Sequence, residues 1–133
     1  NAFWAARFAN PGKDCIITDV AVPFSKFNDS LVLCKREMDK SVLNCPIIGH
    51  IGDGNWHSCI FYDKNKPVEI QETHRLNDLI VSTALKLEGT CTAEHGVGKH
   101  KVKWLKQELG ENAVDFMVSL KKHVDPHLIL NPG

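Results

Sequence analysis

The sequence predicts an α+β fold for residues 1–133, a single domain with helices packed on one face of an antiparallel β-sheet. Three observations support this class: short β-branched segments, an Asp-Gly turn between two of them, and a long segment with helical spacing of apolar residues. The 133 residues are 43% hydrophobic, which suits one domain with a single core. The order of these segments favours an α+β domain.

The first part of the chain is expected to contain the end of a helix, a strand and a second helix. Residues 1–10 are the expected helix end, which Asn10-Pro11-Gly12 breaks. Residues 15–22 are rich in β-branched side chains and predict a strand that stops at the following proline. Ser25 is the expected N-cap of a helix that reaches about Lys40.

A β-hairpin is predicted next, from residues 46–51 and 56–62, because Asp-Gly is the strongest short hairpin signal. In a hairpin centred on the Asp53-Gly54 turn, His50 faces His57 across the two strands, with Cβ atoms about 4.5–5.5 Å apart. Both imidazoles can then reach one divalent cation, at about 2.0–2.1 Å if it is zinc. The plain alternative is a hairpin with two incidental histidines, since zinc usually takes at least three protein ligands.

The rest of the chain is expected to be mostly helical. Residues 66–87 have the apolar spacing of a long amphipathic helix, and residues 90–92 are short and β-prone. Two shorter helices are expected near residues 99–109 and 111–123. A terminal turn is expected from residue 125 onward.

Glu94 and His95 lie between the short β-prone segment and two glycines, where backbone can approach a ligand closely. Glu94 is a candidate third ligand beside His50 and His57, and a His₂Glu set leaves the open coordination position of a catalytic site. His95 is a candidate base, because histidine exchanges a proton most readily near neutral pH. A solvated loop is the alternative interpretation.

Composition excludes several classes of function. Lys+Arg and Asp+Glu are both 16, so no net charge attracts nucleic acid or an anionic membrane. No apolar stretch approaches the roughly 20 residues of a membrane span. The five cysteines are odd in number and lack C-x-x-C spacing, which favours free thiols in a reducing compartment. No targeting segment is visible, but the chain does not begin with Met, so this absence means little.

Four motifs in register resemble one known family. The segment His50-Ile-Gly-Asp-Gly-Asn-Trp-His57 resembles the H-x-G-D-G-N-x-H motif of the FAD-linked oxidase C-terminal domain. Residues 92–98, with sequence TAEHGVG, are similar to the second signature of that family. Residues 18–23 resemble its entering strand, and residues 125–133 resemble its closing motif. The resemblance therefore covers essentially the whole chain.

This resemblance implies a flavoprotein of the vanillyl-alcohol-oxidase type that oxidises D-2-hydroxy acids with FAD. It implies that His50, His57 and Glu94 bind a divalent metal, with zinc expected and manganese or iron as alternatives. It assigns His95 as proton acceptor, Arg7 as partner of the substrate carboxylate, and Asn131 as a flavin contact. A surface role is the alternative for Arg7.

The resemblance also implies partners. The family's FAD-binding domain lies N-terminal to this region, so the chain alone is expected to be inactive. Reduced flavin would pass electrons to a cytochrome, a quinone or another flavoprotein. The expected location is mitochondrial for a eukaryotic protein, and otherwise cytoplasmic or peripheral to the inner membrane.

Departures from the family favour a small substrate. Thr18 and Cys59 stand where D-2-hydroxyglutarate dehydrogenases are expected to have lysine and asparagine. Because a second carboxylate wants a cationic partner, D-lactate is favoured, with glycolate and D-2-hydroxyglutarate as alternatives. Trp56 is expected to pack in the core rather than to limit a substrate pocket. Two other classes stay open: a stand-alone metal-dependent hydrolase, and a non-catalytic module that binds metal and 2-hydroxy acid.

Overall fold

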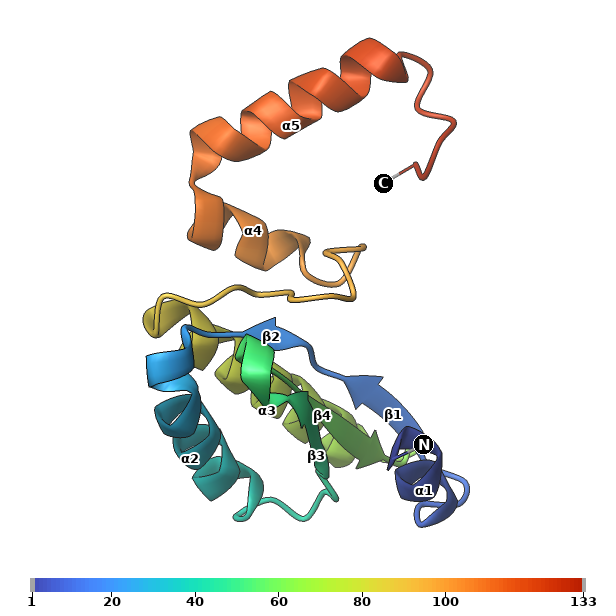
Figure 1. Cartoon of the computed structure of the whole chain (residues 1–133). Helices are drawn as coiled ribbons and strands as arrows, with labels where there is room; N and C mark the ends of the chain where they lie inside the picture. The colour runs from blue at the N-terminus through green and yellow to red at the C-terminus, as the bar shows by residue number, and fades with distance from the viewer. Residues whose placement is uncertain (1, 133) are drawn as a thin grey trace. The chain divides into compact units, whose positions relative to one another are not determined.

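The computed structural model describes residues 2–132 and divides the chain into two compact units, residues 1–95 and residues 96–133. All strands and the three helices α1 (Ala2–Phe8), α2 (Phe27–Met38) and α3 (Pro67–Lys86) belong to the first unit (Figure 1). The second unit contains α4 (Val102–Leu109) and α5 (Glu111–Val124).

The first unit is built on an open antiparallel sheet of four strands, which confirms the expected fold class. Its central strand, β4 (Asn55–Tyr62), pairs with β3 (Ile47–His50) along one edge. Along its other edge, β4 pairs with β1 (Asp14–Ile17) and then with β2 (Val20–Ala21). The central strand is buried along nearly its whole length, so it carries much of the core.

The strand expected over residues 15–22 is interrupted at Thr18-Asp19, although its register with β4 is the same on both sides. The Ser58 amide donates to the Thr18 hydroxyl at 2.9 Å, while the Thr18 amide donates to the Ser58 carbonyl. The hydroxyl thus takes the place of the backbone acceptor that a regular antiparallel pair would use. The use of a side-chain acceptor in place of a backbone carbonyl ends β1 and turns the backbone at Asp19.

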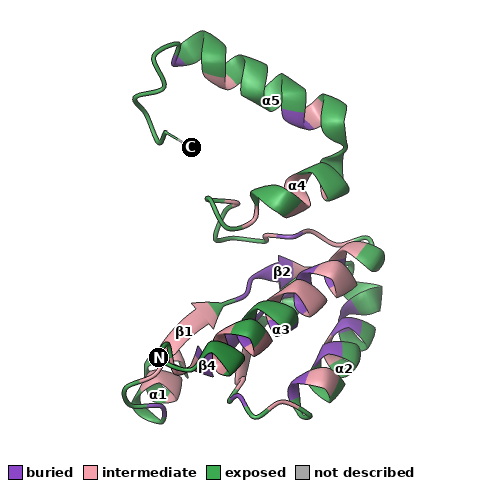
Figure 2. Ribbon diagram, turned by 180° about the vertical axis from the view of Figure 1, so that it is seen from behind, coloured by how far each residue is buried: buried purple, intermediate pink, exposed green. Residues whose placement is uncertain are grey.

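Helices α2 and α3 cover one face of the sheet, as expected for this fold class (Figures 1 and 2). Trp56 is fully buried and donates its Nε1–H to the Ser30 hydroxyl of α2 at 3.1 Å. Ser58 contacts Met38 of α2 from the same face of β4. The expected core role of Trp56 is confirmed. Within residues 2–132, no helix combines the length and apolar character needed to cross a bilayer.

The predicted N-cap of the second helix is wrong. Residues Phe24–Lys26 form a 3₁₀ turn, and the cap position of α2 falls on Lys26 without a side-chain hydrogen bond. The Lys26 amide donates to the Pro23 carbonyl at 2.7 Å, which leads the chain through the 3₁₀ turn into the helix. Because backbone satisfies this first donor, Ser25 has no capping function.

The predicted register of the hairpin is also wrong, by two residues. His50 pairs with Asn55, and His57 pairs with Ile48. The loop is a 3₁₀ turn at Ile51–Asp53 closed by Gly54 at φ 69°, so it lies one residue earlier than predicted. Since side chains alternate with a period of two, a shift of two residues leaves both histidines on the same face.

The second unit ends in the expected terminal turn, which Asp125 organises. The buried Asp125 carboxylate accepts hydrogen bonds from the amides of Ile129 and Leu130, both at 3.0 Å. It also pairs with Lys121 one helical turn earlier in α5. These contacts hold the segment that leads to Asn131, which has a positive φ of 46°.

Candidate metal and substrate site

The histidines of the hairpin lie on the sheet face that α2 and α3 leave uncovered. Trp56 and Ser58 point toward α2, so alternation along β4 directs His57 to the opposite face. His50 and Ile48 follow the same alternation on β3, with His57 opposite Ile48. The His50 and His57 rings are therefore diagonal neighbours, with centroids 5.9 Å apart.

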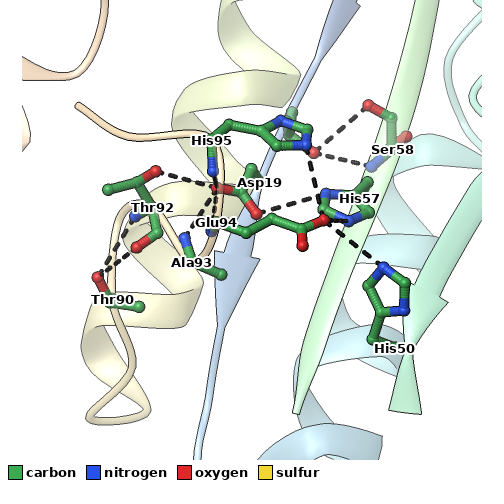
Figure 3. Close-up of polar contacts among 10 residues, drawn as sticks. Asp19, His50, His57, Ser58, Thr90, Thr92, Ala93, Glu94 and His95 are labelled. Carbon is green, nitrogen blue, oxygen red and sulfur yellow. Dashed lines mark hydrogen bonds and ion pairs between the residues drawn. The ribbon is translucent and has the colours of Figure 1, made fainter. Parts of the chain in front are cut away.

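The segment after α3 brings Glu94 and His95 to this face. The Thr90 amide donates to the Ala21 carbonyl of β2 at 2.8 Å, which docks the segment against the sheet edge. Gly89 permits the approach, because a Cβ at this position would lie 2.2 Å from the same carbonyl. Residues 92–95 then fold over Asp19 toward β4, as Figure 3 shows.

Glu94 Oε1 lies between the two imidazoles, 3.0 Å from His57 Nε2 and 3.6 Å from His50 Nε2. One atom from each of these three side chains lies within 4.8 Å of the others. Tetrahedral zinc ligands at about 2.0–2.1 Å lie roughly 3.4 Å from one another, so the observed distances fit this ligand set. The three residues expected from the sequence are thus brought together.

His95 lies directly beside this ligand set. Its ring stacks on that of His57, with centroids 4.8 Å apart and an interplanar angle of 5°. Its Nε2 is 3.7 Å from Glu94 Oε1. A substrate hydroxyl bound at the open position of a metal here would be within reach of this imidazole.

A second group, Asp19 with His57 and His95, also meets the geometric requirement for binding a metal. It lies on the inner side of His57, whose Nδ1 is 3.4 Å from Asp19 Oδ1. The Asp19 side chain is completely buried, whereas the His50 and Glu94 side chains are 59% and 48% exposed. Two of the three side chains are exposed in the group of His50, His57 and Glu94, but only His95 in the second group, so the first group is the more open to solvent.

Arg7 is not brought to these residues. Arg7 lies in α1 and donates Nη1–H to the Lys13 carbonyl at 3.0 Å, next to the start of β1. From Cys15 to Asp19 the strand direction covers roughly 13 Å, so Arg7 lies toward the other end of the strand. Asn131 belongs to the second unit. The roles expected for both residues stay predictions.

At the two positions used to infer the size of the substrate, the side chains are neutral and buried. Thr18 is fully buried and engaged with the Ser58 amide. Cys59 is 1% exposed, and its thiol cannot carry a positive charge. Neither position presents a cation to a second substrate carboxylate.

The sequence predicted no role for Asp19, whose carboxylate contacts His57 and the backbone of Glu94 and His95. Its Oδ2 accepts four hydrogen bonds, from the Thr92 hydroxyl and from the amides of Ala93, Glu94 and His95, at 2.8–3.0 Å. The available signal was a carboxylate inside a β-branched strand, where an acidic residue is rare unless it has partners.

The α+β fold thus presents two imidazoles and one carboxylate close enough together to hold a metal ion. The model of the family described as FAD linked oxidases, C-terminal domain, matches residues 1–133. The chain therefore belongs to this family, as the four sequence motifs indicated.

Individual relatives support the same family. The chain is 46% identical over 132 residues to the mitochondrial D-lactate dehydrogenase [cytochrome] of Arabidopsis thaliana, covering 99% of the chain and 23% of the relative. It is 44% identical over 135 residues to D-lactate dehydrogenase [cytochrome] 1, mitochondrial, of Saccharomyces cerevisiae, covering 98% of the chain and 23% of the relative. Glycolate oxidase subunit GlcD of Bacillus subtilis is 34% identical over 118 residues, covering 89% and 25%. The chain spans about a quarter of the length of these relatives.

Proposed function

We propose that this chain is the substrate- and metal-binding part of an FAD-dependent D-2-hydroxyacid dehydrogenase that oxidises D-lactate to pyruvate. The observation that carries the proposal is the convergence of His50, His57 and Glu94 on one point, with His95 beside it. Two imidazole nitrogens and one carboxylate oxygen are the donor set of catalytic zinc sites. Manganese and iron also accept such ligands.

The residues divide the chemistry among them. His50, His57 and Glu94 hold the cation, to which the carboxylate and the hydroxyl of a 2-hydroxy acid can both bind. His95 receives the hydroxyl proton on its imidazole, which lies next to that position. Arg7 stays the predicted partner of the substrate carboxylate, for which a guanidinium offers two parallel hydrogen bonds, although its side chain here bonds the Lys13 carbonyl toward the other end of the strand. Oxidation of D-lactate then requires only that the hydrogen on Cα leave with its electron pair.

The absent groups supply the remaining chemistry. A divalent cation lowers the pKa of a bound hydroxyl and stabilises its negative charge. FAD, which the family name supports, would supply the hydride acceptor. Because we propose that a separate FAD-binding domain completes the enzyme, the isolated chain is expected to be inactive. Asn131 is the proposed flavin contact of this chain.

The substrate is proposed to be a small monocarboxylate. The neutral, buried Thr18 and Cys59 would leave the second carboxylate of D-2-hydroxyglutarate without a cationic partner at these positions. The names of several relatives support D-lactate. Glycolate is the nearest competitor, because one methyl group discriminates by only about 1–3 kcal/mol in an apolar pocket.

The relatives also support a proposal for electron acceptor and compartment. Several are named as cytochrome-dependent and mitochondrial, which favours a cytochrome acceptor in mitochondria. A quinone or a flavoprotein is the alternative acceptor.

The test uses the full-length protein with its flavin-binding domain. Anaerobic flavin bleaching is followed with D-lactate, L-lactate, glycolate and D-2-hydroxyglutarate, before and after chelation. We expect rapid bleaching by D-lactate that chelation abolishes and added Zn²⁺ restores. His95→Gln should slow bleaching by roughly 10²–10⁴-fold, the usual contribution of a general base. His74→Gln, at an exposed histidine of α3, is the matched control and should be without effect.

Other outcomes point elsewhere. Bleaching by glycolate or D-2-hydroxyglutarate in preference to D-lactate would reassign the substrate within the family. Tight binding of a 2-hydroxy acid without bleaching would indicate a non-catalytic binding module. Hydrolytic turnover by the metal-loaded chain alone would indicate a hydrolase.

A further inference from the structure

We propose that Asp19 is the positioning residue of the site: it fixes the tautomer of His57 and holds the backbone that carries Glu94 and His95. The proposal rests on the proposed function, since it concerns ligands of the proposed cation. Asp19 touches neither substrate nor cofactor in this role. It acts through three residues that do.

The contacts of Asp19 divide between its two oxygens. Oδ2 accepts the amides of Ala93, Glu94 and His95 and the hydroxyl of Thr92. Oδ1 lies 3.4 Å from His57 Nδ1 (Figure 3). A carboxylate is an acceptor at both oxygens, so it suits a set of donors on both sides. An amide side chain would present an acceptor to only one of them.

The contact with His57 determines which ring nitrogen can bind metal. Among the described residues, none forms a hydrogen bond of regular geometry with the buried Nδ1 atom of His57. A buried imidazole nitrogen requires a partner, and Asp19 Oδ1 is within reach. Catalytic hydrogen bonds are often long before the ligand binds. With its proton on Nδ1 facing Asp19, His57 keeps the Nε2 lone pair directed at the cation position, beside Glu94 Oε1.

The contact with the loop determines where Glu94 and His95 lie. Three consecutive amides converging on one oxygen fix the backbone from residue 93 to residue 95. Asp19 itself is held in the strand break created by the Thr18 hydroxyl. Asp19 therefore couples the position of the strand to the position of the loop. A ligating histidine usually donates its second N–H to such a carboxylate or carbonyl.

Charge supports the same assignment. A buried carboxylate needs compensation from donors or a cation. Asp19 has the loop amides on one side and the proposed cation, through His57, on the other. Together with Glu94, it brings two negative charges to balance one divalent cation.

The test is Zn²⁺ affinity of the full-length protein, measured by competition with a chromogenic chelator. Asp19→Asn keeps one oxygen for the loop amides but turns an NH₂ group toward His57 Nδ1. This change should place the His57 proton on Nε2 and raise the Zn²⁺ dissociation constant by about 10–100-fold, the usual effect of losing such a partner. Thr92→Val removes one donor to the same carboxylate without altering the acceptor. It should change the constant much less than Asp19→Asn does, because the three amides of residues 93–95 still hold the carboxylate and its Oδ1 still faces His57.

Two results would overturn the proposal. Asp19→Asn could bind Zn²⁺ as tightly as the wild type, or both variants could weaken binding equally, which would reduce Asp19 to an anchor of the loop. His57→Ala separates the proposal from the proposed function. If His57→Ala leaves Zn²⁺ affinity unchanged, the metal site itself is wrong. If only His57→Ala weakens binding, the metal site stands and the role of Asp19 fails.

A second measurement does not depend on the folding of a variant. Ring ¹⁵N chemical shifts of His57 in the Zn²⁺-loaded wild type report which nitrogen carries the proton. The proposal requires the proton on Nδ1 and the metal on Nε2. The reverse arrangement would overturn it.

Discussion

Replacing Gly54 with alanine should loosen the hairpin that places His50 and His57 on one face of the sheet. Gly54 has φ 69° at the end of the 3₁₀ turn, where a side chain costs about 1–2 kcal/mol. Its added Cβ would lie 2.2 Å from the Val22 carbonyl oxygen. Relieving that overlap costs a further 1–3 kcal/mol or so, as for other overpacked sites. The turn cannot easily move away from the Val22 carbonyl to relieve this overlap, because the Val22 amide donates a hydrogen bond to the Gly54 carbonyl at 3.0 Å.

The two effects together amount to about 2–5 kcal/mol, so amide exchange in β3 and β4 should accelerate by roughly 30-fold or more. Hydrogen exchange of the full-length protein, read by mass spectrometry on peptides that cover residues 47–62, measures this locally. Zn²⁺ affinity should fall in parallel, because the turn sets the separation of His50 and His57. Local exchange is the appropriate readout, since unfolding of a multidomain protein is not a two-state process.

Gly52→Ala in the same turn is the matched control. A Cβ at Gly52 would meet no atom within 4 Å, and its φ lies outside the left-handed region. Exchange should therefore change by no more than about twofold, as for other exposed substitutions. If both alanine variants exchange at the same rate, the turn does not constrain the hairpin and the reasoning is refuted.

Two further predictions concern ionisable groups away from the site. Burial raises the pKa of Cys45 to about 11, so iodoacetamide should alkylate this thiol slowly at pH 8 and faster up to about pH 11. A rate that levels off near pH 9 would contradict this. The hydrogen bond from Lys121, then those from the amides of Leu130 and Ile129, lower the pKa of Asp125. Its stabilisation of the terminal turn is therefore complete above about pH 4 and is lost as the pH falls through the lowered pKa. Protection of the Ile129 amide should follow this course and lose its pH dependence in Asp125→Asn, whose amide does not titrate but still offers one acceptor oxygen.

Local patterns in the sequence were sufficient to predict the hairpin and the two histidines that it presents on one face. The Asp-Gly turn located the hairpin, and the period of two in β-strands placed His50 and His57 on one face. The register was wrong because a 3₁₀ turn at Ile51–Asp53 closes the loop one residue early. The prediction that both histidines lie on one face is correct despite this error, since the face depends on parity and not on the exact pairing. The two residues are diagonal neighbours, however, and not directly opposite each other.

The role of Asp19 could not be predicted in the same way, because it depends on contacts between residues far apart in the chain. Nothing local indicates that the Thr18 hydroxyl replaces a backbone acceptor for Ser58 and so interrupts the strand. The partners of Asp19 lie more than 70 positions later, at residues 92–95. A period-two strand pattern predicts a continuous strand through this position and therefore hides the break.

The proposed metal site combines one proposed ligand that the protein fixes with two that retain freedom. His57 is buried in the central strand between Asp19 and Glu94, whereas His50 and Glu94 are largely exposed. Ordering an exposed side chain on binding costs about 0.5–1.5 kcal/mol, so the cation must overcome this cost for His50 and Glu94 but not for His57. His57 is thus the proposed ligand that is already in place, while the side chains of His50 and Glu94 become ordered beside it. Asp19 is proposed to orient His57 and to anchor the loop of Glu94. A displacement of the Asp19 side chain would therefore shift two of the three proposed ligands.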